Sequence, residues 1–114
     1  MKNVLTIMNS KEGFRHPKTI CLDEKTEWIF GSNTEESIPD IELPDCFPEI
    51  QGKFVYEDKY WFYINKHFNK NVFHNGKMIK TGAQEVDPIF IELGDEIKFI
   101  YNGGEIRCVY QRKY

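Results

Sequence analysis

The sequence contains few cysteines, and their spacing excludes several classes of protein. Its 114 residues include three, Cys21, Cys46 and Cys108, which is an odd number without a CxxC pair. This pattern argues against a disulfide framework and against a zinc site, and it is typical of a reducing compartment such as the cytosol. We expect the three thiols to be buried and to have no redox role.

Long apolar runs are also missing. No stretch approaches the roughly 20 apolar residues that a membrane-spanning helix needs. The N-terminal stretch has one lysine, a short apolar segment and no small-residue cleavage site, so it does not predict a signal peptide. We therefore predict a cytoplasmic location, either for a free protein or for the cytosolic domain of a membrane-anchored one. The chain ends directly after a strand-like run, which favours its being the N-terminal part of a longer protein.

Sequence signatures of catalysis and of metal binding are absent as well. There is no GxSxG, HExxH or P-loop pattern, and His16, His67 and His74 have no metal-ligand spacing. The acidic residues between positions 35 and 49 do not have the spacing of an EF-hand, and we interpret them as an exposed acidic loop. The sequence thus predicts a protein that is not an enzyme and that has no metal and no cofactor.

The net charge of −3 is mild, which argues against a nucleic-acid partner. The charge is unevenly distributed along the chain. Residues 1–57 contain 6 Lys or Arg and 11 Asp or Glu, whereas residues 58–114 contain 9 and 7. Between Lys59 and Gln84 there are five lysines and no acid.

Helical periodicity is nearly absent, and the chain consists of short strand-like runs separated by turns. Asn75-Gly76 and Asn102-Gly103-Gly104 are strong turn signals because these residues tolerate positive φ. The aromatic run at 60–64 predicts core and cross-strand ring pairs rather than a sugar-stacking platform. The spacing predicts one all-β domain over 1–114, an antiparallel β-sandwich of about ten to eleven short strands. The expected strands are 3–8, 18–23, 27–30, 40–43, 53–56, 60–65, 71–74, 77–80, 88–93, 94–101 and 105–111.

Three stretches, in this order and spacing, resemble a forkhead-associated (FHA) domain. "WIFGSNTEESIPDIELPD" (28–45) resembles the hydrophobic-Gly-Arg and Asp-Ile-x-Leu pieces of that family. "NVFHNGKMI" (71–79) resembles its Asn-Gly-Thr-x-Val-Asn-Gly turn, and "IELGDEIKF" (91–99) resembles its Leu-x-x-Gly-Asp-x-Ile. The resemblance covers about residues 3–110, and it implies a non-catalytic module that binds a protein partner.

The resemblance also implies where a phosphothreonine would bind, and the sequence departs from the family at those positions. Ser32 stands where the family has its first arginine, and Pro48 and Glu49 stand at its Ser-Arg pair, followed by Gln51-Gly52 at its His-Gly. A carboxylate near a phosphate is unfavourable by about 4 kcal/mol at 4 Å and an effective dielectric constant near 20. Proline brings neither a hydroxyl nor an amide hydrogen. The departures predict binding that does not depend on phosphothreonine.

The family's asparagine position has two possible alignments. An ungapped alignment places Lys70 and Asn71 there, and a shift of one residue places Asn69 there instead. Lys66, Lys70, Lys77 and Lys80 cluster around the same loops, which leaves a second interpretation open, namely a reader of phosphopeptides or acidic peptides. A third interpretation is a structural β-sandwich that self-associates through its edges.

We predict that a protein partner binds loops 32–39, 44–52, 66–71 and 80–88 at one end of the sandwich. Exposed Phe47 and Ile50 would serve as apolar anchors, and Glu49 and Lys70 would fix the register. Degenerate FHA domains of this kind resemble those of the FtsK/SpoIIIE-type ATPase of type VII secretion and of a type III secretion inner-ring component. That resemblance implies a role in assembly or recruitment. The candidate binding residues are Ser32, Phe47, Glu49, Ile50, Gln51, Lys66, Asn69, Lys70 and Asn71.

Overall fold

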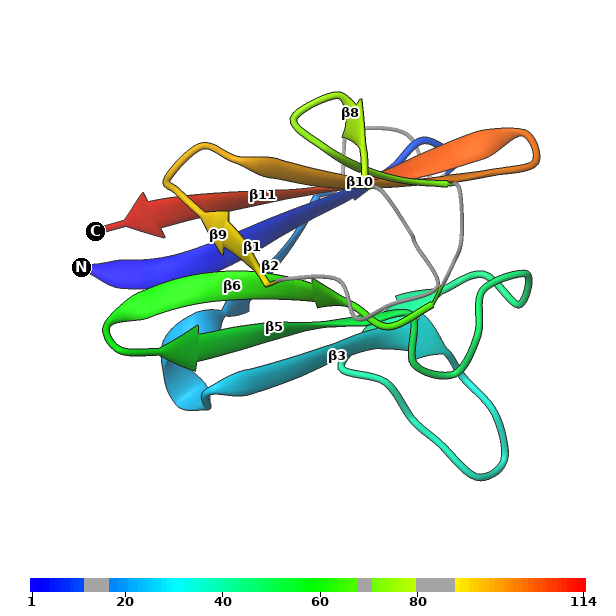
Figure 1. Ribbon diagram of the computed structural model, residues 1–114, viewed down its shortest axis with the longest axis horizontal. Coiled ribbons are helices and arrows are strands. Elements are labelled where there is room, and N and C mark those ends of the chain that lie inside the picture. The colour runs from blue at the N-terminus through cyan, green and yellow to red at the C-terminus, as the bar shows by residue number, and fades with distance from the viewer. Residues whose placement is uncertain (12–16, 68–70, 80–87) are drawn as a thin grey trace. The chain divides into compact units, whose positions relative to one another are not determined.

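The computed structural model describes residues 1–11, 17–67, 71–79 and 88–114, and nearly all of its regular structure is β-strand (Figure 1). A single 3-10 turn, η1 (Leu22–Glu24), follows the second strand. The strands are β1 (Lys2–Asn9), β2 (Lys18–Cys21), β3 (Glu27–Ser32), β4 (Ile41–Leu43), β5 (Gly52–Glu57), β6 (Tyr60–Asn65), β7 (Val72–His74), β8 (Lys77–Met78), β9 (Ile89–Ile91), β10 (Glu96–Tyr101) and β11 (Gly104–Lys113).

The contacts divide the chain into two compact units, and each unit contains one sheet. The first unit comprises Met1–Glu24, Lys70–Ile79 and Glu92–Tyr114. Its six-stranded sheet has the order β2-β1-β11-β10-β7-β8, with antiparallel neighbours throughout. Strands from both ends of the chain are therefore paired at the centre of this sheet, where β1 and β11 share eight residue pairs.

Alternation along the strands of the first unit separates a buried face from a more exposed one. In β10, Ile97 and Phe99 are buried and their neighbours are partly exposed, as a strand period of two requires. The turn between β7 and β8 has Asn75 at φ 49° and Gly76 at φ 82°, the conformation that an Asn-Gly hairpin adopts. The predicted turn at this position is confirmed.

The second unit comprises Lys25–Asn69 and Lys80–Ile91, and its five-stranded sheet has the order β4-β3-β5-β6-β9. β5 and β6 form a hairpin whose two-residue loop, Asp58-Lys59, has positive φ at both residues. The rings of Phe30, Phe54 and Tyr63 are almost completely buried in this unit and meet edge to face.

The predicted all-β fold class is confirmed, with eleven strands in two sheets among the described residues. One pairing differs from a purely antiparallel sandwich, because β4 lies parallel to β3. The eight residues 33–40 connect β3 to β4 and return the chain so that the two strands run in the same direction. Within the described residues, no helix is long and apolar enough to cross a membrane.

Candidate protein-interaction site

The loop before β5 lies along the end of β3 and is held there by the backbone. The Ser32 N–H donates to the Pro48 carbonyl at 3.0 Å, and the Gln51 N–H donates to the Phe30 carbonyl at 2.8 Å. These two bonds continue the contact with β3 into the loop that precedes Gly52, the first residue of β5. The sequence resemblance assigned Ser32 to the family's first arginine and Pro48 to the serine of its Ser-Arg pair. These two residues are neighbours in the second unit.

Gly31 permits this close approach. A Cβ atom on Gly31 would lie 1.8 Å from the Glu49 carbonyl oxygen and 2.5 Å from its carbonyl carbon. Both are backbone atoms, so no side-chain rotation relieves the overlap. The glycine therefore sets the path of the loop that carries Glu49 and Ile50.

A buried polar cluster anchors the loop from below. The Asn65 Oδ1 atom accepts hydrogen bonds from the Gln51 Nε2 group and the Tyr63 hydroxyl, each at 3.0 Å. The Asn65 Nδ2 group donates to the His67 carbonyl at 3.0 Å. This cluster ties the segment before β5 to the segment after β6, and its side chains are paired as buried polar groups require.

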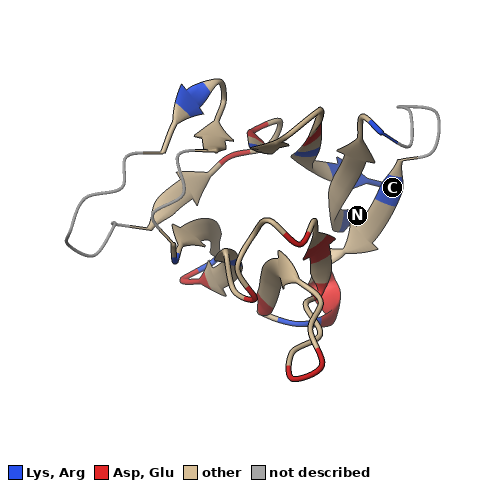
Figure 2. Ribbon diagram, turned by 90° about the vertical axis from the view of Figure 1, so that its right-hand side faces the viewer, with Lys and Arg blue, Asp and Glu red and all other residues tan. Residues whose placement is uncertain are grey.

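The solvent-facing side of these loops is acidic and carries isolated aliphatic side chains. The Thr34 hydroxyl donates to the Glu49 carboxylate at 2.9 Å, which connects loop 33–40 to loop 44–51. Ile38 is 84% exposed and Ile50 is 38% exposed. Figure 2 looks onto this end of the strands, and acidic segments in red predominate on the loops in the lower part of the picture. The surface suits a partner with basic and apolar side chains.

Several predicted site residues are not accessible. Phe47 was expected to be an exposed anchor, and this was wrong, because the side chain is only 3% exposed. Its N–H closes a turn onto the Pro44 carbonyl at 2.9 Å, and the ring belongs to the core. Ser32 is 5% exposed and Gln51 is fully buried, so both support the loop from inside.

The remaining predicted residues have different surroundings. Glu49, Ile50 and Lys66 are exposed in the second unit. Asn71 is exposed immediately before β7 in the first unit, where its carbonyl accepts the Ile100 N–H at 2.8 Å. The predicted positions Asn69, Lys70 and Lys80, and loop 80–88 up to residue 87, lie outside the described residues.

The expectation of three buried thiols holds for one of them. Cys108 is buried on β11, Cys21 is half-buried at the end of β2, and Cys46 is exposed in the loop after β4. Cys46 lies in the turn between Pro44 and Phe47, where Phe47 rather than the thiol takes the interior position. The exposed thiol was not predicted, because loop 44–51 has no strand alternation from which its orientation follows.

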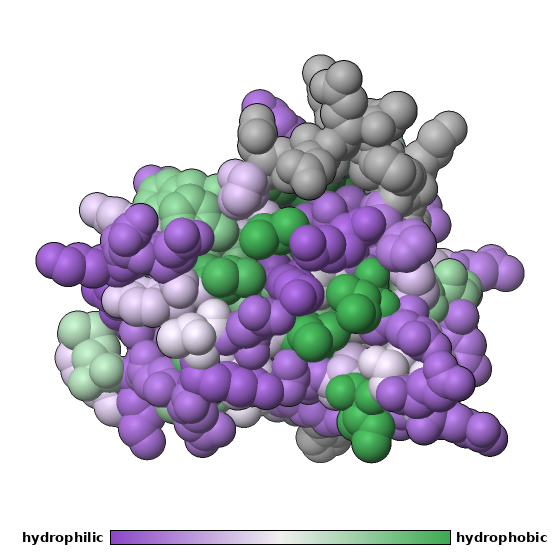
Figure 3. Space-filling model, turned by 60° about the horizontal axis from the view of Figure 1, so that its bottom comes forward, coloured by the Kyte–Doolittle hydropathy of each residue, from purple (hydrophilic) through white to green (hydrophobic). Residues whose placement is uncertain are grey.

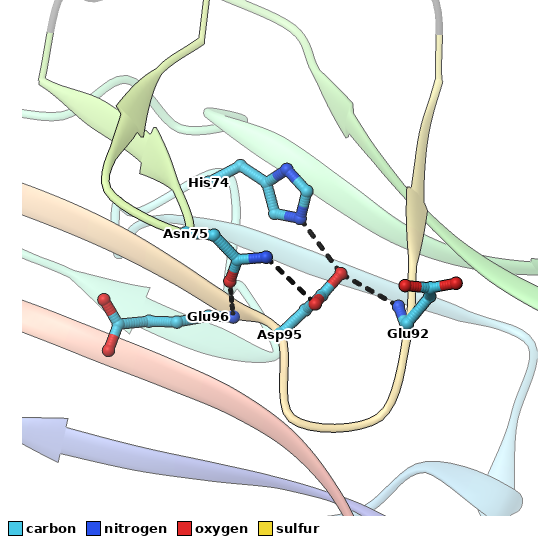
Figure 4. Close-up of polar contacts among 5 residues, drawn as sticks. All are labelled: His74, Asn75, Glu92, Asp95 and Glu96. Carbon is cyan, nitrogen blue, oxygen red and sulfur yellow. Dashed lines mark hydrogen bonds and ion pairs between the residues drawn. The ribbon is translucent and has the colours of Figure 1, made fainter.

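A second polar cluster, in the first unit, joins two turns that the sequence singled out (Figure 4). The Asp95 carboxylate accepts hydrogen bonds from the Asn75 amide at 2.9 Å and from the Glu92 N–H at 2.9 Å, and it lies 3.0 Å from His74 Nε2. The Glu96 N–H donates to Asn75 Oδ1 at 2.8 Å. Burial alone would raise the pKa of Asp95, but these hydrogen bonds and the charge of His74 outweigh burial, and its pKa is lowered.

The arrangement of this second cluster is structural. The Asn75 amide and the Asp95 carboxylate face each other across the Asn75-Gly76 and Gly94-Asp95 turns, whereas the carboxylates of Glu92 and Glu96 take no part in the contacts drawn (Figure 4). In the described part of the chain, this cluster included, no group of three His, Cys, Asp or Glu side chains is placed to hold a metal ion.

Sequence reasoning included loop 32–39 in the contact surface but did not single out Ile38 and Thr34 within it. Among the described residues, Ile38 is the most exposed of the large apolar side chains apart from the C-terminal tyrosine, and Thr34 bonds to Glu49. The available signal was a lone isoleucine between Ser37 and Pro39 in a loop that is otherwise acidic. It was not decisive, because a single apolar residue in a loop is common on protein surfaces.

Comparison with solved structures agrees with this architecture. The yeast splicing factor Pml1 superposes with a TM-score of 0.76 at 15% identity over 99% of this chain and 80% of that one. The N-terminal FHA domain of Rad53 from S. cerevisiae, solved with a phosphothreonine peptide, gives 0.67 at 16% identity over 96% and 94%. The chain has the FHA fold.

The same fold occurs in a bacterial protein. Slr1951 from Synechocystis sp. gives a TM-score of 0.63 at 18% identity over 99% of this chain and all of that one. No family model matches the chain, and no curated protein matches it. Identities of this size are informative about the FHA fold and about nothing finer, so function has to be argued from the site.

Proposed function

We propose that this chain is a non-catalytic protein-interaction module that uses the loop end of its second unit and does not require a phosphothreonine. The observation that carries the proposal is the Glu49 carboxylate. It is exposed beside Ser32 and Pro48, at the position that the resemblance assigns to an arginine, and it is hydrogen-bonded to Thr34 at 2.9 Å.

The electrostatics of the loops support phosphate independence. Charge-assisted hydrogen bonds from arginine to phosphate contribute roughly 1.5–3 kcal/mol each. At the three assigned positions the chain has a buried serine, a proline and an exposed carboxylate. A dianionic ligand would therefore lose these donors and meet a like charge, while a basic segment would meet an attractive surface.

The exposed aliphatic side chains support a protein partner. Ile38 and Ile50 lie on the two loops that the Thr34–Glu49 hydrogen bond connects. Apolar anchors surrounded by charges are the usual composition of small protein interfaces. A role in assembly or recruitment within a secretion-type protein is part of this proposal and comes from the sequence resemblance.

Peptide titration tests the phosphate independence. A degenerate phosphothreonine library and its unphosphorylated twin are titrated at about 50 and 200 mM salt, a range over which charge-driven binding changes steeply. We expect no preference for the phosphorylated library. Binding that requires the phosphate, and that weakens steeply with salt, would overturn the proposal and favour the lysine-based reader.

A selection experiment tests the location. Unphosphorylated peptides are selected from a displayed library against the chain, and the selected peptides are then measured against Glu49→Lys and Ile50→Ser. We expect losses of at least about tenfold in affinity, as truncation of interface anchors produces. Met78→Ser is the matched control, because Met78 is 52% exposed and belongs to the first unit. Equal losses in the control, or none in the loop variants, would reject the loop end as the contact.

A further inference from the structure

The five-stranded sheet of the second unit has a second feature, distinct from its loop end, on its less buried face. In β6, Trp61, Tyr63 and Asn65 are buried, whereas Tyr60, Phe62 and Ile64 point to the other side. A solvated face of an antiparallel sheet ordinarily carries polar residues. Here the outward residues of β6 are two aromatics and an isoleucine.

Cross-strand pairing makes these residues continuous across the sheet. Phe62 is paired with Phe90 of β9 on one side and with Val55 of β5 on the other. The Phe90 ring centroid lies 5.3 Å from that of Tyr60 and 5.9 Å from that of Phe62. We call the set the aromatic face; it consists of Ile29, Val55, Tyr60, Phe62, Ile64 and Phe90.

The aromatic face remains accessible in this structure. Tyr60 is 55% exposed and Phe90 is 42% exposed, although their rings contact each other edge to face. Figure 3 looks on the side where β3, β5 and β6 run in Figure 1, and it shows groups of hydrophobic side chains with hydrophilic ones between and around them. Contiguous exposed apolar residues with a polar rim are typical of interaction sites.

The charges at the rim indicate the kind of partner. Glu57 is paired with Tyr60, and Glu27 is paired with Val55, so both carboxylates border the aromatic face. Lys53 lies on the same face, between its cross-strand partners Ile29 and Ile64, and forms an ion pair with Glu27 at 2.8 Å. Glu57 has no ion pair with a described residue. The described residues of this unit contain four lysines, no arginine and nine acids. At the described part of the rim, Glu57 therefore leaves one uncompensated negative charge.

We propose that the aromatic face is a docking surface for a cationic protein segment that presents apolar side chains between its lysines or arginines. Charge complementarity selects this occupant. A second copy of the chain would bring the same acids opposite one another, and an anionic membrane or a nucleic acid would be repelled by the rim. The aromatic face and the loop end are different surfaces, but both suit a cationic and apolar partner, so the test has to separate them by the position of the residues that respond.

A designed peptide pair tests the proposal on the whole chain. The probe is a peptide in which lysine alternates with leucine or tryptophan, and its twin has glutamate in place of lysine. Backbone amide shifts are followed by NMR during each titration. The lysine peptide is expected to bind and to shift amides of β5, β6 and β9, whereas the glutamate twin is not expected to bind.

Variants assign the binding to the face. Tyr60→Ser combined with Phe90→Ser should weaken the lysine peptide by at least about tenfold, and Glu57→Lys should weaken it and reduce its salt dependence. Met78→Ser, an exposed apolar residue of the first unit, should leave it unchanged. These variants leave Glu49 and Ile50 intact, so failure here is distinguishable from failure of the loop-end proposal.

Four outcomes would overturn the proposal. The first two are the absence of lysine-peptide binding up to about millimolar concentration and equal binding of both peptides. The third is concentration-dependent dimerisation that is abolished by Tyr60→Ser combined with Phe90→Ser. The fourth is binding to anionic phospholipid vesicles through the same face. Thermal unfolding of each variant verifies folding, and the exposure of Tyr60 and Phe90 predicts that it is retained.

Discussion

At the scale of single residues, the candidate loop depends on one glycine and one asparagine. Gly31 leaves the space into which the Glu49 backbone fits, and Asn65 bonds the segments on both sides of the β5–β6 hairpin. Neither residue contacts solvent as a ligand group would. In the proposed function, their contribution is to set the position of Glu49 and Ile50.

Gly31→Ala is expected to lower the free energy of unfolding by about 3 kcal/mol or more, because the added methyl group would overlap backbone atoms of Glu49. Gly76→Ala is the control. It has open space for a Cβ at a φ of +82°, so it should cost about 1–2 kcal/mol for the left-handed conformation alone. Urea denaturation measures both. Equal stability of the two variants would show that the loop moves away from β3 at little cost.

Asn65→Leu is expected to lower the free energy of unfolding by about 1–3 kcal/mol, because the buried side chain bonds to Gln51, Tyr63 and the His67 carbonyl. Tyr63→Phe removes only one of these bonds and should cost about 0.5–1.5 kcal/mol. Denaturant unfolding of both variants checks the order. A smaller loss in Asn65→Leu than in Tyr63→Phe would contradict the central place of the asparagine.

At the scale of elements, the second polar cluster connects the β7–β8 turn to the entry of β10. Asp95 accepts from Asn75 on one side and from the Glu92 N–H on the other. The two turns were recognisable in the sequence from Asn75-Gly76 and Gly94-Asp95. Their connection by a carboxylate is visible only once the strands are paired, because twenty residues separate the partners.

The lowered pKa of Asp95 predicts a specific acid dependence of stability. Protonation is harder in the folded chain than in the unfolded one, whose ordinary pKa is 3.8, so ionised Asp95 stabilises the fold above that pH. This contribution is lost as the pH falls through the lowered folded pKa. Asp95→Asn should therefore be less stable near neutral pH and lose less stability on acidification. Urea unfolding over a series of pH values measures this.

Asp58→Asn provides the control for the acid series. Asp58 is exposed in the β5–β6 turn at φ 52°, a conformation that asparagine also tolerates. Its acid dependence should follow that of the unmodified chain. An identical pH profile for Asp95→Asn and the unmodified chain would reject the contribution of Asp95.

At the scale of the whole molecule, the reactivities of Cys108 and Cys46 distinguish global unfolding from local exposure. Burial first, and then the nearby charge of Glu96, raise the pKa of Cys108 far above its usual value. The thiolate is the reactive form, so Cys108 should react with a thiol reagent only as the chain unfolds, while exposed Cys46 should react at once.

Variants with a single cysteine separate these reactions. In Cys21→Ser combined with Cys46→Ser, labelling of Cys108 is expected to accelerate with urea in parallel with the equilibrium population of unfolded chain. Mass spectrometry of the labelled protein measures the rate. Labelling of Cys108 at a rate that is independent of urea would mean that its strand opens locally, and would contradict its place in a cooperative core.

The sequence by itself determined the strands, the main turns and the fold class. Alternation and Asn-Gly or Gly-Asp turns are local signals, and each strand that they predicted is present within a few residues. The assignment of Pro48 and Glu49 to the family's Ser-Arg pair rests on the sequence resemblance and stays a prediction. Accessibility in the loops could not be predicted, as Phe47 illustrates, since loop residues have no period that assigns them to a face.

Only the tertiary structure decided which residues meet across the chain. It buried Phe47, Ser32 and Gln51, exposed Ile38 and Cys46, and paired Phe62 with Phe90 to form the aromatic face. These outcomes follow from strand pairing between distant segments. Burial and contact are properties of the packed chain, whereas alternation and turn chemistry are properties of the local one.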